Sequence, residues 1–295
     1  MASIAQPHCA VITNIGSAHA AFLDNKETTF SEKLHITDYF QNDSIVFLNR
    51  DDNFLSSLSD SNELKGAKKV WYGLSSNCDY RAEDIAYTNE GMIFKCIVAN
   101  KFSRTINIPV YGVHNVRNAL AAIAVAHEFG IDCNDIVDSF AGFKSSPMRM
   151  QCDNSGSIIL IDDTFNSSPE SVYVALEVIT EIKKAKKLKR SVVILEEMAL
   201  LGEKSSDLHF LVGQKLSLLN IDLLISVGEQ AKSIADGAKS INNSISYRSY
   251  PSNEKLNTDL HNIISDGDIV LVKGSRSTKM ETITGYIRRK TWMKF

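Results

Sequence analysis

The second half of the chain alternates between short apolar runs and segments of helical periodicity, and this pattern constrains the fold most. Strand-like runs occupy residues 157–161, 191–195, 222–227 and 268–272, and helical segments occupy residues 172–182, 208–219, 231–238 and 280–289. Strands that alternate with helices favour parallel βαβ units with right-handed crossovers. The alternation therefore predicts a layered α/β domain with a mostly parallel sheet.

The first half is less regular but is also of α/β type. Residues 10–15 and 45–48 are buried-strand runs, and several short alternating runs between 70 and 110 indicate small strands. Residues 116–129 have helical spacing, and Gly130 stands where a helix C-terminal cap is expected. The polar residues 153–156 interrupt the pattern, so we predict one domain over residues 1–152 and a Rossmann-like domain over residues 153–295.

Composition excludes several classes of protein. The 295 residues contain 32 Lys and Arg against 35 Asp and Glu, so the net charge of −3 excludes a globally basic nucleic-acid binder. The basic run at 183–190 has no interleaved aromatic residue and predicts a solvated helix end. No apolar run reaches the roughly 18 residues of a membrane span. With no secretory signal and five scattered cysteines lacking a CxxC pair, we expect a cytoplasmic protein.

Several polar residues follow predicted strands in the first half, where ligands of parallel sheets are held. His19 follows a strand and a glycine turn, and Asn49 begins a polar cluster after the second strand. His114 and Asn115 precede the predicted helix, where Asn can act as a cap and His can stack on a base. Each of these residues also has a purely structural interpretation, as a surface residue, a turn or a cap.

The second half contains three further candidates. Asp162 and Asp163 follow a strand and suit a ribose diol or a metal, or simply form a polar turn. Arg149 lies between two methionines, and an arginine in such a setting usually pairs with an anion such as phosphate. The segment 273–277 (KGSRS) combines two cations and two hydroxyls around a glycine, which suits a carboxylate. Neither GxxxxGK[ST] nor GxGxxG occurs.

Taken in order, these segments resemble the Mur ligase family. The resemblance covers nearly all of the chain and rests on residues 11–19, 48–52, 112–122, 149–151, 161–166, 197–203 with His209, and 271–277. The EMALLGE and KGSRS segments are similar to the MurF branch, and the DNPR motif of the diaminopimelate-adding branch is absent. The resemblance implies an ATP-dependent amide ligase of peptidoglycan synthesis that joins D-Ala-D-Ala to UDP-MurNAc-tripeptide through an acyl phosphate.

The resemblance also implies roles for individual residues. His19 and a carbamylated Lys33 would bind Mg²⁺, and together with Arg149, which would hold a phosphate, they are the catalytic candidates. The candidates for contacts to ATP are Asn49, His114, Asn115, Asn118, Arg149, Asp163 at the ribose, and Asn166. The candidates for contacts to the incoming dipeptide are Lys273, Ser275 and Arg276.

The sequence departs from the family pattern in three respects. Residues 20–23 (AAFL) lack the acidic residue that commonly follows the histidine in the family. Glu196 and Leu200 stand where the family has a glycine and a glutamate. Family members also carry a UDP-sugar-binding domain and a phosphate loop ahead of the segment at 11–19. We therefore expect the C-terminal part of the central ATPase domain followed by the complete C-terminal domain, and little ligase activity from this chain alone. The partner would then be a separate N-terminal half that carries the phosphate loop. Two alternatives stay open: a split or decayed fragment without catalysis, and an amide ligase of the folylpolyglutamate or cyanophycin type.

Overall fold

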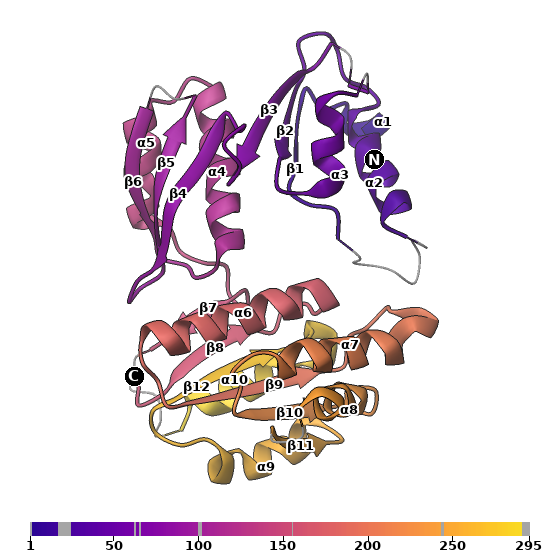
Figure 1. Cartoon of the computed structure of the whole chain (residues 1–295), viewed down its shortest axis with the longest axis vertical. Coiled ribbons are helices and arrows are strands. Elements are labelled where there is room, and N and C mark those ends of the chain that lie inside the picture. The colour runs from indigo at the N-terminus through magenta and orange to yellow at the C-terminus, as the bar shows by residue number, and fades with distance from the viewer. Residues whose placement is uncertain are drawn as a thin grey trace. The chain divides into compact units, whose positions relative to one another are not determined.

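The computed structural model describes residues 2–16, 25–61, 63–64, 66–99, 102–154, 156–242 and 245–290. They form two compact units, of which the first ends at Lys144 and the second begins at Ser145 (Figure 1). This division lies a few residues before the predicted boundary. The reason is that strand β7 (Gln151–Asp153) pairs with strand β8 (Ile159–Asp163) in the sheet of the second unit.

The second unit contains the predicted parallel sheet, which confirms the α/β fold class. Its strand order is β11-β10-β9-β12-β8-β7, and β7 alone among these strands runs antiparallel to its neighbour. The remaining strands are β9 (Arg190–Glu196), β10 (Leu223–Val227), β11 (Ser246–Tyr250) and β12 (Asp268–Lys273). Strand β11 has no apolar run, and the sequence pattern did not predict it.

Helices cover both faces of this sheet (Figure 1). Helices α6 (Pro169–Ala185), α7 (Ser205–Ser217) and α8 (Lys232–Ile241) lie on one face, and α9 (Asn253–Ile263) and α10 (Glu281–Arg288) on the other. The chain therefore leaves β9 and its neighbour β12 toward opposite faces. Ligands of open α/β sheets bind beyond the carboxyl ends of strands at such a switch point.

Helices α7 and α8 approach each other backbone to backbone. A Cβ atom added at Gly213 would lie 1.9 Å from the carbonyl oxygen of Ile234, and one added at Gly237 would lie 2.0 Å from that of Phe210. Each glycine therefore faces the backbone of the other helix, and neither position has room for a side chain.

The first unit has a sheet that is parallel at one end and antiparallel at the other. The order is β1-β2-β3-β4-β5-β6, with parallel pairing from β1 to β4 and antiparallel pairing from β4 to β6. The strands are β1 (Cys9–Ile12), β2 (Ile45–Asn49), β3 (Lys68–Gly73), β4 (Tyr80–Tyr87), β5 (Met92–Val98) and β6 (Phe102–Ile108). Among the described residues, β1 has a neighbour on one side only.

The helices of the first unit within the described ranges are α1 (Ala2–Ala5), α2 (Lys26–Leu34), α3 (Asn53–Ser56), α4 (Val113–Glu128) and α5 (Cys133–Ser139). Short 3₁₀ turns of the two units lie at His35–Thr37, Ser57–Ser59, Phe140–Gly142, Gly202–Lys204 and Arg276–Thr278. Helix α4 begins three residues before the predicted start, because Gly112 adopts a φ of 101° and turns the chain there. Gly130 has a φ of 86° after α4, as the predicted cap requires. Within the part of the chain that is described, no helix is long and apolar enough to cross a membrane.

Candidate ligand-binding sites

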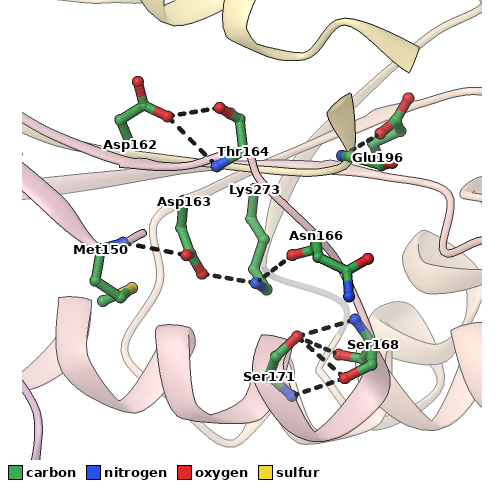
Figure 2. Close-up of polar contacts among 10 residues, drawn as sticks. Met150, Asp162, Asp163, Thr164, Asn166, Ser168, Ser171, Glu196 and Lys273 are labelled. Carbon is green, nitrogen blue, oxygen red and sulfur yellow. Dashed lines mark hydrogen bonds and ion pairs between the residues drawn. The ribbon is translucent and has the colours of Figure 1, made fainter. Parts of the chain in front are cut away.

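A buried ion pair joins the carboxyl ends of β8 and β12. Asp163 and Lys273 are register partners, and Lys273 Nζ lies 2.6 Å from Asp163 Oδ2 (Figure 2). The ammonium also donates to the carbonyl oxygen of Asn166 at 3.0 Å, and only 1% of Lys273 is exposed. The other carboxylate oxygen of Asp163 accepts the Met150 N–H at 3.1 Å. The structure thus uses Lys273, predicted to face the dipeptide, as an internal cross-link between strands.

Arg149 is held in an exposed position beside this ion pair. Its guanidinium carbon lies 3.9 Å from the ring centroid of Phe165, and the Phe165 N–H donates to the Met148 carbonyl at 3.1 Å. Met148 and Met150 have φ angles of 62° and 48°, a left-handed conformation that costs energy in non-glycine residues. This backbone turns Arg149 outward over an aromatic ring, where an anion can reach the guanidinium.

The neighbouring carboxylate Asp162 has a structural role. It is 1% exposed, and its Oδ2 accepts Thr284 Oγ1 at 2.8 Å and Arg288 Nη1 at 2.9 Å. Its Oδ1 accepts the Thr164 hydroxyl at 2.6 Å. Of the two adjacent aspartates, only Asp163 retains partial exposure, and the side chain of Asn166 is exposed nearby.

A pocket of about 320 Å³ lies beyond the carboxyl ends of β9, β10 and β12, at the switch point of the sheet. Its lining residues are Glu197, Met198, Ala199, Leu200, Leu201, Gly202, Ser205, Gln230, Ser275 and Thr278. Ser275 belongs to the predicted dipeptide site, whereas Arg276 is exposed and is not among the lining residues.

Glu196 fixes one wall of this pocket. Its side chain is buried, and its Oε2 accepts the Ser275 N–H at 2.9 Å, which binds the end of β9 to the loop after β12 (Figure 2). Burial raises the pKa of this carboxyl group, and hydrogen bonds from Thr278 and Ser275 oppose that shift. The carboxylate that replaces the family glycine therefore anchors the KGSRS loop.

Sequence reasoning assigned no role to Glu197, Ser205 or Gln230, although all three line this pocket. Gln230 follows the predicted strand at 222–227, at its carboxyl end. Asp163 was selected because it lies at the carboxyl end of a predicted strand, and Gln230 meets the same criterion.

A second, mostly apolar cavity of about 110 Å³ lies in the first unit. Its lining residues are Ile108, Val110, Asn115, Asn118, Ala119, Ala122, Phe140 and Phe143. Asn115 Nδ2 donates to the Tyr111 carbonyl at 2.8 Å, and the exposed Asn118 lies one turn further along α4, with its Nδ2 3.4 Å from Asn115 Oδ1. The structure brings these two predicted nucleotide contacts together in one cavity, and His114 precedes them on α4 without lining it.

The polar cluster after β2 joins three elements. Asn49 is 6% exposed, its Nδ2 donates to the Thr13 carbonyl at 2.9 Å, and its Oδ1 accepts the Asp51 N–H at 3.0 Å. Asp52 accepts the Ile15 N–H at 2.8 Å and caps α3. Both ends of the Asn49 amide are therefore used within the protein, so the structure gives this residue a positioning role.

Of the two predicted metal ligands, the structure describes only one. Lys33 is exposed in the last turn of α2, and His19 lies outside the described residues. Among the residues that are described, no group of three or more His, Cys, Asp or Glu side chains is placed to hold a metal ion. The described part of the chain thus shows no completed metal site, and the pair His19 and Lys33 stays a prediction.

The basic run at 183–190 differs from the solvated helix end that we expected at one position. Lys183 is buried, and its Nζ lies 2.6 Å from Asp222 Oδ2 and 3.0 Å from the carbonyl oxygen of Asn220. Hydrogen bonds from Lys183 and Ser191 lower the pKa of Asp222 against the opposing effect of burial. This lysine binds α6 to the start of β10.

Comparison with known proteins identifies both units. Residues 1–126 match the Mur ligase middle domain, and residues 148–276 match the Mur ligase glutamate ligase domain. The chain is 29% identical over 284 residues to the UDP-N-acetylmuramoyl-tripeptide--D-alanyl-D-alanine ligase of Bacillus subtilis, and 28% identical over 287 residues to that of Escherichia coli. These alignments cover 96% and 95% of this chain and 60% of each relative, so the chain spans about 60% of the length of these relatives.

Solved structures of Mur ligases have the same fold as this chain. A crystal structure of MurF from Acinetobacter baumannii matches with a TM-score of 0.86 and 25% identity, over 98% of this chain and 61% of that one. MurF from Thermotoga maritima in complex with ADP shares the fold, with a TM-score of 0.81 and 22% identity over 98% of this chain and 64% of that one. The chain therefore belongs to the Mur ligase family and carries its middle domain and its glutamate ligase domain.

Proposed function

We propose that this chain is the ATP- and dipeptide-binding part of a cytoplasmic MurF-type ligase of peptidoglycan synthesis. The relatives named above support this assignment, since each matches almost the whole of this chain. The observation that carries the nucleotide part is the cavity at the start of α4, which combines apolar walls with the amides of Asn115 and Asn118. Apolar walls suit the faces of a purine, and an amide can pair with its polar edge because it both donates and accepts.

The other predicted ATP contacts belong to the second unit. Arg149 offers an exposed guanidinium, which suits a phosphate. Asp163 and Asn166 lie together at the end of β8, where a ribose would be bound, while Lys273 holds Asp163 in place. Mg²⁺ at His19 and a carbamylated Lys33, when bound, would neutralise phosphate charge.

The pocket at the switch point suits the second substrate, D-Ala-D-Ala. The carboxylate of Glu197 can hold an ammonium group, and Leu200 and Leu201 offer apolar surface to a methyl group. Ser275 lines this pocket and Arg276, the next residue, is exposed, and we propose that both bind the dipeptide carboxylate. In the proposed reaction, the carboxylate of UDP-MurNAc-tripeptide takes the γ-phosphoryl group of ATP and releases ADP. The dipeptide amine then attacks the acyl phosphate, forms the amide and releases phosphate and a proton.

Nucleotide binding tests this proposal directly. We expect the 295-residue chain to bind ADP in a calorimetric titration, and Asn118→Ala to weaken binding about tenfold, the value of one lost hydrogen bond. The matched control is Asn107→Ala, which removes an exposed asparagine from β6 that does not line the cavity. Equal affinities of the two variants, or no binding of ADP by the unmodified chain, would contradict the assignment.

The ligase step is expected to need more than this chain, because the chain spans about 60% of its relatives. We expect the chain alone to release no ADP that depends on D-Ala-D-Ala in a coupled assay. Adding the part of the Bacillus subtilis ligase that this chain does not match tests whether a separate N-terminal half completes the enzyme. Steady dipeptide-dependent release of ADP by the chain alone would overturn this expectation.

A further inference from the structure

Four residues that line the pocket at the switch point are joined in a ring of hydrogen bonds that closes through one buried imidazole. The Met198 N–H donates to His209 Nε2 at 2.8 Å, and His209 Nδ1 lies 2.7 Å from the Ser205 carbonyl oxygen. Ser205 Oγ donates to Gln230 Oε1, and the Gln230 N–H donates to Glu197 Oε2 at 3.2 Å. Glu197 and Met198 are consecutive, so the ring is closed.

His209 is the one member of this ring that does not line the pocket, and none of it is exposed. A backbone N–H can only donate, so Nε2 must carry a lone pair where it faces Met198. Nδ1 then carries the hydrogen that Ser205 accepts. Burial lowers the pKa of this imidazole, and the hydrogen bond with the Ser205 carbonyl and the charge of Glu197 oppose that shift without cancelling it.

The conformation of the segment from Glu197 to Lys204 depends on the hydrogen bond between Met198 and His209. It follows the last residue of β9 and forms no strand, and Leu200 adopts a φ of 61° with half of its surface exposed. A left-handed leucine persists only where its surroundings determine the backbone. The hydrogen bond to His209 fixes the start of this segment, and the 3₁₀ turn Gly202–Lys204 leads into α7, which carries His209.

We propose that His209 is a positioning residue, which sets the shape of the dipeptide pocket by holding residues 197–204 against α7. This inference rests on the proposed function for the identity of the ligand, but the anchoring itself follows from the contacts above. It assigns a role to a residue that contacts no substrate.

Two conservative variants, His209→Gln and His209→Asn, separate the two hydrogen bonds that the His209 imidazole makes. Glutamine at 209 can place an amide oxygen near the position of Nε2 and accept from Met198. Asparagine can place its amide N–H₂ near Nδ1 and donate to Ser205, but it does not reach Met198. Leucine fills space and makes neither bond. A residue that only fills the core would show no advantage of glutamine over leucine.

The first readout is hydrogen exchange of the Met198 amide, measured by NMR on the full chain without ligand. We expect its protection to fall at least about tenfold in His209→Asn and His209→Leu, and to stay within about threefold in His209→Gln. The amide of Val212, in the buried part of α7, reports whether the unit remains folded. Unchanged protection of Met198 in the Leu variant, or equal losses in the Gln and Asn variants, would overturn the proposal. If His209→Leu fails to fold, the difference in Met198 protection between His209→Gln and His209→Asn still tests the proposal.

The second readout is titration with D-Ala-D-Ala, followed by the amide signals of residues 197–204. We expect the Asn variant to bind about tenfold more weakly than the unmodified chain, and the Gln variant to bind nearly as tightly. If the unmodified chain binds no dipeptide while the exchange pattern holds, the assignment of this pocket to the dipeptide is overturned and the anchoring role of His209 stands.

Discussion

Asp163→Asn is expected to lower the free energy of unfolding by about 3–5 kcal/mol, because it leaves a buried ammonium without its counter-charge. Lys273 is 1% exposed, and Asp163 is its only carboxylate partner among the described residues. The asparagine keeps the volume and one oxygen that can accept from Met150, so the substitution removes the charge and the acceptor that faces Lys273. Urea unfolding, followed by NMR signals of β12, measures the loss.

The reciprocal variant Lys273→Met should lower the free energy of unfolding by less, about 1–3 kcal/mol, because Asp163 retains some contact with water and methionine, like lysine, is long and unbranched. The control is Glu229→Gln, which breaks the exposed pair between Lys232 and Glu229 and should change stability by less than about 0.5 kcal/mol. A loss in Asp163→Asn no larger than in Lys273→Met would show that burial of the lysine does not control the energy of this pair.

Gly213→Ala is expected to destabilise the second unit by about 3 kcal/mol, at the upper end of overpacking costs. The added methyl group would lie 1.9 Å from a backbone oxygen of α8, so the two helices must separate and lose contact along their length. Chemical denaturation of the full chain measures the change.

The matched control for this variant is Gly285→Ala in α10. There the nearest atom to an added Cβ is the flexible end of Arg289, at 3.4 Å. This substitution should stabilise the chain by about 0.5–1 kcal/mol, since alanine has the higher helix propensity. Stabilisation at both positions would mean that helix propensity, rather than the contact between α7 and α8, dominates.

Apolar runs in the sequence predicted the strands that are buried on both faces. The strands β8, β9, β10 and β12 are apolar runs because helices cover both of their faces, and all four were predictable from those runs. Strand β11 lies at the edge of its sheet and reads SYRSY, so it carries no such signal. Helix α9 was missed although Leu256, Leu260 and Ile263 have helical spacing and Ser252 caps it.

The candidate sites were predictable as segments but not as contacts. The sequence placed Asn115 and Asn118 on one helix, and the structure shows that they share a cavity. It also singled out Lys273 and Asn49, but no pattern reveals that their polar atoms are satisfied internally by Asp163 and Thr13. Such pairings depend on strand register, which is a property of the folded sheet.

In the part of the chain that the structure describes, one edge of β1 has no neighbouring strand, and this affects how binding and stability should be measured. This strand reads CAVI, and it contains none of the charged residues or prolines with which sheets commonly block further pairing. Val11 is 39% exposed, whereas Ala10 and Ile12 on either side of it are 3% and 5% exposed. We therefore expect self-association of this polypeptide to rise with its concentration, so affinities should be compared only across a dilution series in which the sedimentation coefficient stays constant.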